Sequence, residues 1–135
     1  MSRKNFLPLL AAIILMGAGL FVPAEVLGKK MKDNGYVIEY GKIIATGDKP
    51  VVVDLYADWC GPCRISKPVF NAVKDRMHKK AVFISINIEE YEDLAGTYYV
   101  RSIPTTLLIK PDGSVDRHTG LMNEEELEEF VKRNL

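Results

Sequence analysis

Cysteine and histidine are scarce in this chain of 135 residues, which contains two of each. Zinc usually takes four ligands, and His78 and His118 lie at no spacing from the cysteines that is typical of a metal site. Because Cys60 and Cys63 would close a very short loop, a purely structural disulfide between them would constrain the unfolded chain little. Half of a zinc site and a structural bridge are therefore the weaker interpretations, and we expect no metal and no cofactor.

Internal repeats, low-complexity tracts and net charge are also absent, since 18 Lys and Arg residues balance 18 Asp and Glu residues. Nothing in the charge pattern resembles a nucleic-acid-binding patch, so we expect no nucleic-acid partner. The length fits a single domain of ordinary size, and the hydrophobic fraction of 47% is typical of a protein with a core. The acidic cluster within residues 124–129 indicates the solvated face of a final helix.

Charged residues are missing from residues 6–24, which follow a basic lead that contains Arg3 and Lys4. This pattern predicts a targeting sequence over residues 1–24. It is either a signal peptide or an uncleaved N-terminal membrane anchor, because the apolar run is nearly long enough to span a bilayer. Either form predicts an exported domain, periplasmic or on the outer face of the cytoplasmic membrane, with membrane contact through residues 6–24 in the anchored form.

After a polar, Lys-rich linker over residues 25–35, residues 36–135 alternate between strand and helix patterns, which predicts a mixed α/β domain. Apolar and β-branched runs predict strands at residues 51–57, 81–88, 105–109 and 115–119. Apolar residues at helical spacing predict helices at residues 36–46, 65–79, 90–98 and after the N-cap residue Asn123. A strand can precede the first of these helices, and Pro68 should kink the second.

The cysteines stand in the motif Trp59-Cys60-Gly61-Pro62-Cys63, directly after a predicted strand. We expect Cys60 at the start of the following helix, where unpaired backbone N–H groups and the helix dipole favour a thiolate. Pro62 fits the first helical turn, and Gly61 keeps the connection between the cysteines small. Cys63 lies one turn later on the same face and can form a disulfide with Cys60. The spacing therefore predicts reversible thiol–disulfide exchange, with Cys60 as the nucleophile and Cys63 as the resolving cysteine.

Several further motifs follow one another along the chain: residues 53–63, which end in the cysteine motif, then Pro68, the turn at residues 101–105, and Gly120. With these motifs the chain resembles the thioredoxin family over roughly residues 36–135. The resemblance implies a thioredoxin-like α/β fold, a central mixed sheet of four to five strands flanked by helices, with a structural turn at Gly120. Residues 49–60 and 119–122 also partly resemble the C-terminal periplasmic domain of the transmembrane thiol–disulfide interchange reductase.

The resemblance implies that Asp54 is buried beneath the cysteines and accepts the proton of Cys63. Burial in an apolar strand raises the pKa of such a carboxyl group toward that of a useful base. Thioredoxin proper has a lysine in the second buried strand that pairs with this aspartate, whereas here Ser85 takes that position. We therefore expect Asp54 to lack a nearby cation, to ionise less readily, and to change the redox poise.

The resemblance also assigns client contacts to Trp59, Ile103 and Pro104. Pro104 would follow a cis peptide bond from Ile103 and pack against the disulfide, since an X-Pro bond can be cis at modest cost. The backbone beside it would pair with an extended segment of the client. An ordinary trans proline at the start of a strand is the alternative. Trp59 would shield Cys60 and offer an apolar docking surface.

Together these features predict an exported thiol–disulfide oxidoreductase. Gly-Pro between the cysteines resembles the reducing members of the thioredoxin family, so the resemblance implies a protein-disulfide reductase. The resemblance and the expected compartment imply the partners: disulfide-containing client proteins, such as apocytochromes c awaiting haem, and a membrane thiol-transporting protein as electron donor. We expect a monomer. The alternatives are a dithiol oxidase or isomerase, a non-catalytic module that binds extended peptides beside Pro104, and a metal chaperone.

Overall fold

The computed structural model describes residues 34–135 of the protein. These residues form a four-stranded sheet with the order β4-β3-β5-β6 and a separate two-stranded sheet, β1-β2. The strands are β1 (Tyr36–Glu39), β2 (Lys42–Ala45), β3 (Val51–Tyr56), β4 (Val82–Asn87), β5 (Thr105–Ile109) and β6 (Val115–Thr119). The helices are α3 (Gly61–Met77), α4 (Glu92–Thr97) and α5 (Glu124–Lys132). The mixed α/β fold with a central sheet is the one that the sequence predicts.

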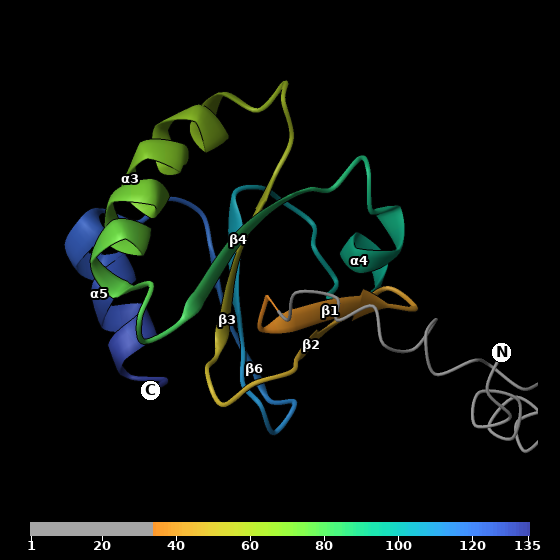
Figure 1. Ribbon diagram of the computed structural model, residues 1–135. Helices are drawn as coiled ribbons and strands as arrows, with labels where there is room; N and C mark the ends of the chain where they lie inside the picture. The colour runs from red at the N-terminus through yellow and green to blue at the C-terminus, as the bar shows by residue number, and fades with distance from the viewer. Residues whose placement is uncertain (1–33) are drawn as a thin grey trace, which may run out of the picture. The chain divides into compact units, whose positions relative to one another are not determined.

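The strand that leads to the cysteines, β3, lies inside the four-stranded sheet. It is parallel to β4 and antiparallel to β5, and β5 is antiparallel to β6. Figure 1 shows α3 and α5 on one face of the sheet, with α4 and the β1–β2 hairpin on the other. Because both faces are covered, residues 51–55 are all buried, as their continuous apolar pattern predicts.

Alternate residues of β3 point to opposite faces of the sheet. Val52 belongs to the core beneath α3 and α5, together with Phe70 and Phe130. Val53 belongs to the core on the opposite face. Asp54 follows Val52 by two residues, so its carboxyl group lies on the face that α3 covers. The strand that builds the core therefore also places a carboxylic acid under the helix that carries Cys63.

The helix predicted over residues 36–46 is wrong, because this segment is the antiparallel hairpin β1–β2. Its turn consists of Tyr40 and Gly41, whose φ angles of 49° and 71° are both left-handed. Two-residue turns of this kind match the twist of paired strands, and their first residue is usually Asn, Asp or Gly. A bulky tyrosine stands in that position here, so the sequence does not indicate the turn. A distant side chain also holds the hairpin, since the Ile43 backbone N–H donates a hydrogen bond to the Tyr98 hydroxyl at 2.9 Å.

The remaining elements lie close to their predicted positions. α3 begins at Gly61, before the apolar pattern of residues 65–79, and Cys60 caps it as the cysteine motif predicts, with Gly61 and Pro62 in its first turn. Pro68 lies inside this helix. β5 and β6 have the predicted bounds, and α4 falls within its predicted range.

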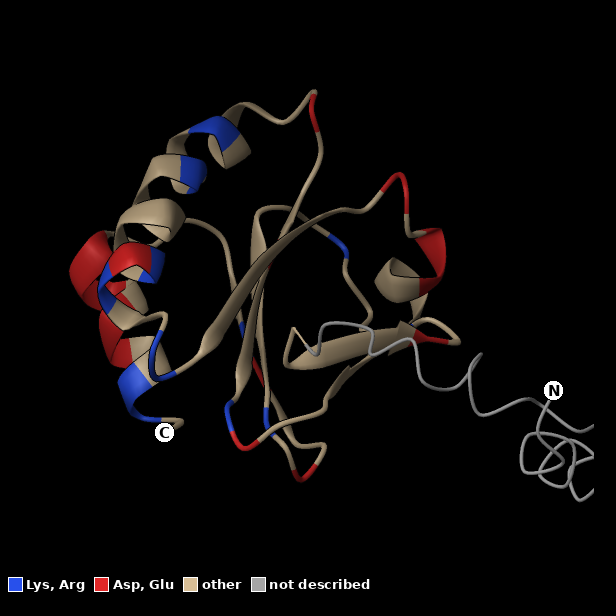
Figure 2. Cartoon of the chain, viewed as in Figure 1, with Lys and Arg blue, Asp and Glu red and all other residues tan. Residues whose placement is uncertain are grey.

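Asn123 starts α5 with a capping box. Its side chain accepts a hydrogen bond from the Glu126 backbone N–H at 2.8 Å, and the Glu126 carboxylate accepts one from the Asn123 N–H at 3.4 Å. Acidic residues fill the first turn, where the helix dipole favours negative charge. Arg76 of α3 forms an ion pair with Glu124 at 2.9 Å. Figure 2 shows acidic residues, coloured red, along the ribbon of α5. The acidic cluster thus belongs to the start and surface of a helix, as predicted.

The predicted targeting sequence, residues 1–24, lies outside the described residues. Among the helices of residues 34–135, none is both long enough and apolar enough to cross a membrane. The choice between a signal peptide and a membrane anchor therefore stays a prediction from the sequence.

Candidate active site

Cys60 and Cys63 form a disulfide at the junction of β3 and α3. β3 is paired on both sides, and a short loop leads from it to Cys60, the N-cap residue of α3. The Cα atoms of the two cysteines are 5.3 Å apart. Both residues pack with Ala57 in a small buried cluster at the end of β3. The buried strand therefore sets the position of the disulfide.

The start of α3 places a hydrogen-bond donor against the sulfur of Cys60. The backbone N–H of Cys63 donates to Cys60 Sγ at 3.2 Å, as an N-terminal helix amide does to an N-cap side chain. The first turn of the helix contains no acidic side chain. After reduction of the disulfide, this N–H and the positive end of the helix dipole would stabilise a thiolate on Cys60. The roles of Cys60 as nucleophile and Cys63 as resolving cysteine stay predictions.

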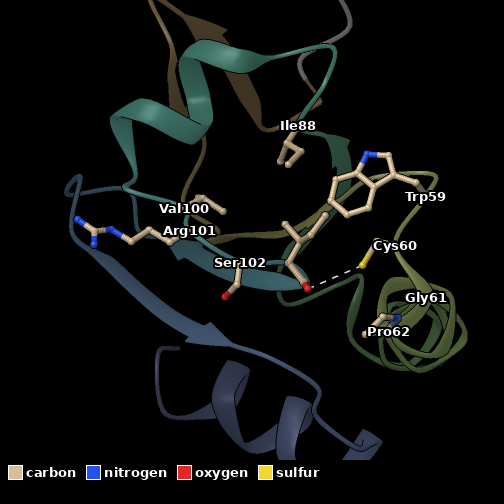
Figure 3. Close-up of a pocket in the computed structure, with 9 residues that line it drawn as sticks. Trp59, Cys60, Gly61, Pro62, Ile88, Val100, Arg101 and Ser102 are labelled. Carbon is tan, nitrogen blue, oxygen red and sulfur yellow. Dashed lines mark hydrogen bonds between the residues drawn. The ribbon is translucent and has the colours of Figure 1, made fainter.

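A groove of about 400 Å³ opens beside the disulfide (Figure 3). Trp59 forms part of its wall with 68% of its surface exposed, whereas Cys60 borders the groove with 4% exposed. Ile103 also lines the groove, as do Gly61 and Pro62 of the cysteine motif. The lining includes four residues that the sequence did not single out as contacts: Ile88, Val100, Arg101 and Ser102.

Pro104 lies next to the groove and is buried. Its peptide bond with Ile103 is cis, as expected. The Ile103 carbonyl oxygen is 3.8 Å from Cys60 Sγ, a contact that the dashed line in Figure 3 marks. The Gly120 N–H donates a hydrogen bond to the Pro104 carbonyl oxygen at 2.8 Å, and the φ of 100° at this position favours glycine. The turn after β6 thus holds the loop that faces the disulfide.

Trp59 is oriented by a residue that the sequence did not predict for the site. Its indole N–H donates a hydrogen bond to the Glu89 carboxylate. The Glu89 backbone N–H donates in turn to the Asn87 side-chain oxygen at 2.9 Å, and the Asn87 amide donates to Asp58 at 3.4 Å. The loop after β4 therefore fixes the wall of the groove. Since Glu89 and Trp59 are 30 residues apart, only the folded chain brings them together.

Asp54 is 2% exposed on β3, on the face that α3 covers. Its neighbours in the adjacent strands are Ser85 of β4 and Thr106 of β5. The loss of hydration on burial raises the pKa of the Asp54 carboxyl group to about 6, while the charge of Lys67 and a hydrogen bond with Ser85 lower it. A carboxyl group with a pKa near 6 can exchange a proton close to neutral pH.

The expectation that Asp54 lacks a nearby cation is wrong. Ser85 does lie across from Asp54 in β4, but Lys67 of α3 acts on the carboxyl group with its positive charge. Lys67 follows Cys63 by four residues, so the two side chains share a face of the helix. This spacing is visible in the sequence once the helix is known to begin at Gly61.

The fold and the site together define a class of protein. A mixed sheet carries a dithiol at a helix start, a buried carboxyl group behind it, and a largely apolar groove beside it. These are the parts of a thioredoxin-like thiol–disulfide exchange domain. Among residues 34–135, no group of three or more His, Cys, Asp or Glu side chains is placed to hold a metal ion.

Comparisons with known proteins agree with this class. The family model for thioredoxin matches residues 35–133. Mitochondrial thioredoxin of Mus musculus is 39% identical over 90 residues, which cover 67% of this chain and 54% of that protein. A thioredoxin of Rickettsia felis is 30% identical over 105 residues, which cover 78% of this chain and 100% of that protein. The chain belongs to the thioredoxin family.

Solved structures show the same likeness. The structure of Fasciola hepatica thioredoxin has a TM-score of 0.59 and 34% identity, and the match covers 65% of this chain and 83% of that chain. The chain spans about half the length of the mitochondrial thioredoxin that it matches, with 54% of that protein covered. The residues that the family model matches, 35–133, contain the fold and the cysteine motif described above.

Asp54 should make folding stability depend on pH. Its pKa is about 6 in the fold against an ordinary value of 3.8, so between these values the folded protein binds more protons than the unfolded chain. The stabilising contribution of the neutral carboxyl group is present below the lower value and is lost as the pH rises through the higher one. We expect Asp54→Asn to raise the free energy of unfolding by about 2 kcal/mol at about pH 8 and by much less at about pH 4. Urea denaturation at both pH values measures this difference, and an equal effect at both would contradict the raised pKa.

The contact between Trp59 and Glu89 can be measured by fluorescence, because Trp59 is the single tryptophan of the chain. In Glu89→Ala the indole loses its acceptor, so we expect acrylamide to quench its emission more strongly. Glu90→Ala removes a neighbouring exposed carboxylate and serves as the matched control. Equal quenching in the two variants would show that Glu89 does not hold the indole.

Proposed function

We propose that this chain is a thiol–disulfide oxidoreductase that reduces disulfide bonds in client proteins with the Cys60–Cys63 dithiol. The observation that carries the proposal is the hydrogen bond from the Cys63 N–H to the Cys60 sulfur at the start of α3. Such a donor stabilises the thiolate, which is the form that attacks a disulfide. Membership of the thioredoxin family supports the same chemistry.

Reduction proceeds in two exchange steps. The Cys60 thiolate first attacks one sulfur of the client disulfide, and the client's other sulfur leaves as a thiolate that takes a proton from water. Cys63 then gives its proton to Asp54 and attacks the Cys60 sulfur, which breaks the mixed disulfide and releases the second client sulfur. Two electrons pass to the client, and the chain is left with the Cys60–Cys63 disulfide that the structure contains.

The groove supports binding of an extended client segment. Its walls include the apolar side chains of Trp59, Ile88, Val100 and Ile103, and the Ile103 carbonyl group lies beside the Cys60 sulfur. Backbone groups in this position can pair with an extended segment, as they do when a strand is added to a sheet edge. Because backbone pairing depends little on the side chains of the client, the proposed substrates are proteins of varied sequence with accessible disulfides.

Residues 1–24 support a location outside the cytoplasm, in the periplasm or on the outer face of the cytoplasmic membrane. Such compartments are oxidising, so a reductase there needs a supply of electrons. A membrane thiol-transporting protein is the proposed donor. Apocytochromes c awaiting haem and wrongly paired secreted proteins are the proposed clients. The Gly61-Pro62 pair between the cysteines favours this direction over oxidation or isomerisation.

Replacing Cys60 and replacing Cys63 should have different effects on the reaction. In an insulin-reduction assay, Cys60→Ser and Cys63→Ser should both lose turnover, because each step needs its own sulfur. Only Cys63→Ser should accumulate a mixed disulfide with the client, since it keeps the attacking cysteine and lacks the resolving one. Turbidity measures the turnover, and mass spectrometry after acid quenching measures the trapped species.

The insulin assay and two further measurements, of peptide binding and of the equilibrium with glutathione, separate the alternatives. Reduction of insulin that survives in Cys60→Ser would overturn the proposed chemistry. Tight peptide binding by a wild-type protein without turnover would favour the non-catalytic module. A strongly oxidising equilibrium with glutathione would favour the oxidase or isomerase.

A further inference from the structure

The two edges of the four-stranded sheet differ in charge. β6, at one edge, carries Asp116, Arg117 and His118 within five residues. β4, at the other edge, consists of residues 82–87 and contains neither a charged residue nor a proline. Its register with β3 is continuous, so it has no bulge either. Charged side chains, prolines and bulges are the usual features that keep an edge strand from pairing with another chain. The β4 edge is therefore open to pairing, whereas the β6 edge is protected.

The outer side of β4 presents the backbone groups of Phe83 and Ser85. The N–H groups of Val82 and Ile88 donate to backbone carbonyl groups on the β3 side, each at 2.9 Å. Because the backbone groups of successive residues in a strand point to opposite sides, the N–H and C=O groups of Phe83 and Ser85 point away from β3. Among residues 34–135, no strand pairs with that side of β4. Ser85 is exposed and Ile84 is partly exposed, so the middle of the edge is accessible.

Opposite charges flank β4 at its two ends. Lys79 and Lys80 precede the strand, and Glu89 and Glu90 follow it. All four residues are exposed, and none of them forms an ion pair within residues 34–135. A second copy of β4 that runs antiparallel to the first brings the lysines of each chain to the glutamates of the other. The edge is therefore complementary to itself in charge as well as in backbone hydrogen bonding.

We propose that the β4 edge is the interface of a symmetric dimer, in which two copies of this chain pair their β4 strands antiparallel about Ile84. Phe83 of each copy faces Ser85 of the other, and each facing pair exchanges two backbone hydrogen bonds. The two-fold axis lies at Ile84 because the outward-pointing groups of Phe83 and Ser85 flank it equally. The next outward-pointing carbonyl group, that of Asn87, already accepts a hydrogen bond at 3.1 Å from the turn after β4.

The two active sites of this dimer lie apart. β3 and β4 are parallel, and the disulfide follows the end of β3. Antiparallel pairing of β4 therefore places the two grooves at opposite ends of one continuous sheet, so each can bind its own client. The proposal differs from the monomer expected from the sequence, because an open edge is a property of the folded sheet.

The first test exchanges charges between the two ends of β4. Lys80→Glu and Glu90→Lys should each weaken association of the full chain about tenfold or more at low salt, because each variant brings like charges together at both ends of the interface. Mixed in equal amounts, the two variants should associate as tightly as the wild type, since each charge again meets its opposite. Lys132→Glu makes the same change on α5 and is the matched control. Sedimentation equilibrium measures the association, in a mild detergent because residues 6–24 are uncharged and largely apolar.

Hydrogen exchange followed by NMR locates the interface. The amide protons of Phe83 and Ser85 should exchange about tenfold more slowly in concentrated than in dilute samples of the wild type. Those of Ile84 and Ile86, which point toward β3, should exchange at the same rate in both. In Lys80→Glu, the slowing at Phe83 and Ser85 should be lost.

Three results would each overturn the dimer: a wild-type chain that stays monomeric at every concentration, a mixture of the two variants that associates no better than either alone, or slower exchange only at amides outside β4. If the chain stays monomeric and an added extended peptide slows exchange at Phe83 and Ser85, the edge takes a different partner and the proposal also fails. None of these results touches the proposed reductase, which fails instead if Cys60→Ser retains activity.

Discussion

One backbone hydrogen bond, from the Cys63 N–H to the Cys60 sulfur, is the interaction on which the site depends. It exists because Cys60 caps α3 while Gly61 and Pro62 form the first turn. The first N–H groups of a helix lack partners within the helix, and a sulfur at the cap takes the place that an oxygen has at most helix starts. The helix start thereby favours negative charge on that sulfur. The chemistry follows from where the helix begins.

The central strand β3 links this helix start to the rest of the fold. Its burial holds the disulfide in place, and its alternation puts Asp54 beneath α3 while Val53 packs on the other face. Burial makes the carboxyl group a better proton acceptor near neutral pH, but it also destabilises the folded chain when that group is charged. Lys67 and Ser85 moderate this conflict from the helix and the neighbouring strand. Proton acceptance by Asp54 and the stability of the folded chain therefore make opposite demands on its pKa, and the surrounding residues determine that pKa.

Features determined by neighbours in the chain could be predicted from the sequence. The helix start at Cys60, the strands of residues 105–119 and the cap at Asn123 all depend on local patterns. The resemblance to thioredoxin located Asp54 and Pro104. The β1–β2 hairpin was not predicted, because its turn has Tyr40 in a left-handed conformation, which bulky residues rarely adopt.

The contacts that tune the site could not be predicted, because they join residues far apart in the chain. Glu89 reaches Trp59 from the loop after β4, and Lys67 reaches Asp54 from a helix to a strand. The acidity of Cys60 tests the central claim most directly. The rate of iodoacetamide alkylation of reduced Cys63→Ser, followed across the pH range, reports the thiolate of this single remaining cysteine. We predict an inflection well below the pKa of about 8.5 of a free cysteine, whereas an inflection at that value, or no alkylation of the folded protein at any pH, would contradict the account.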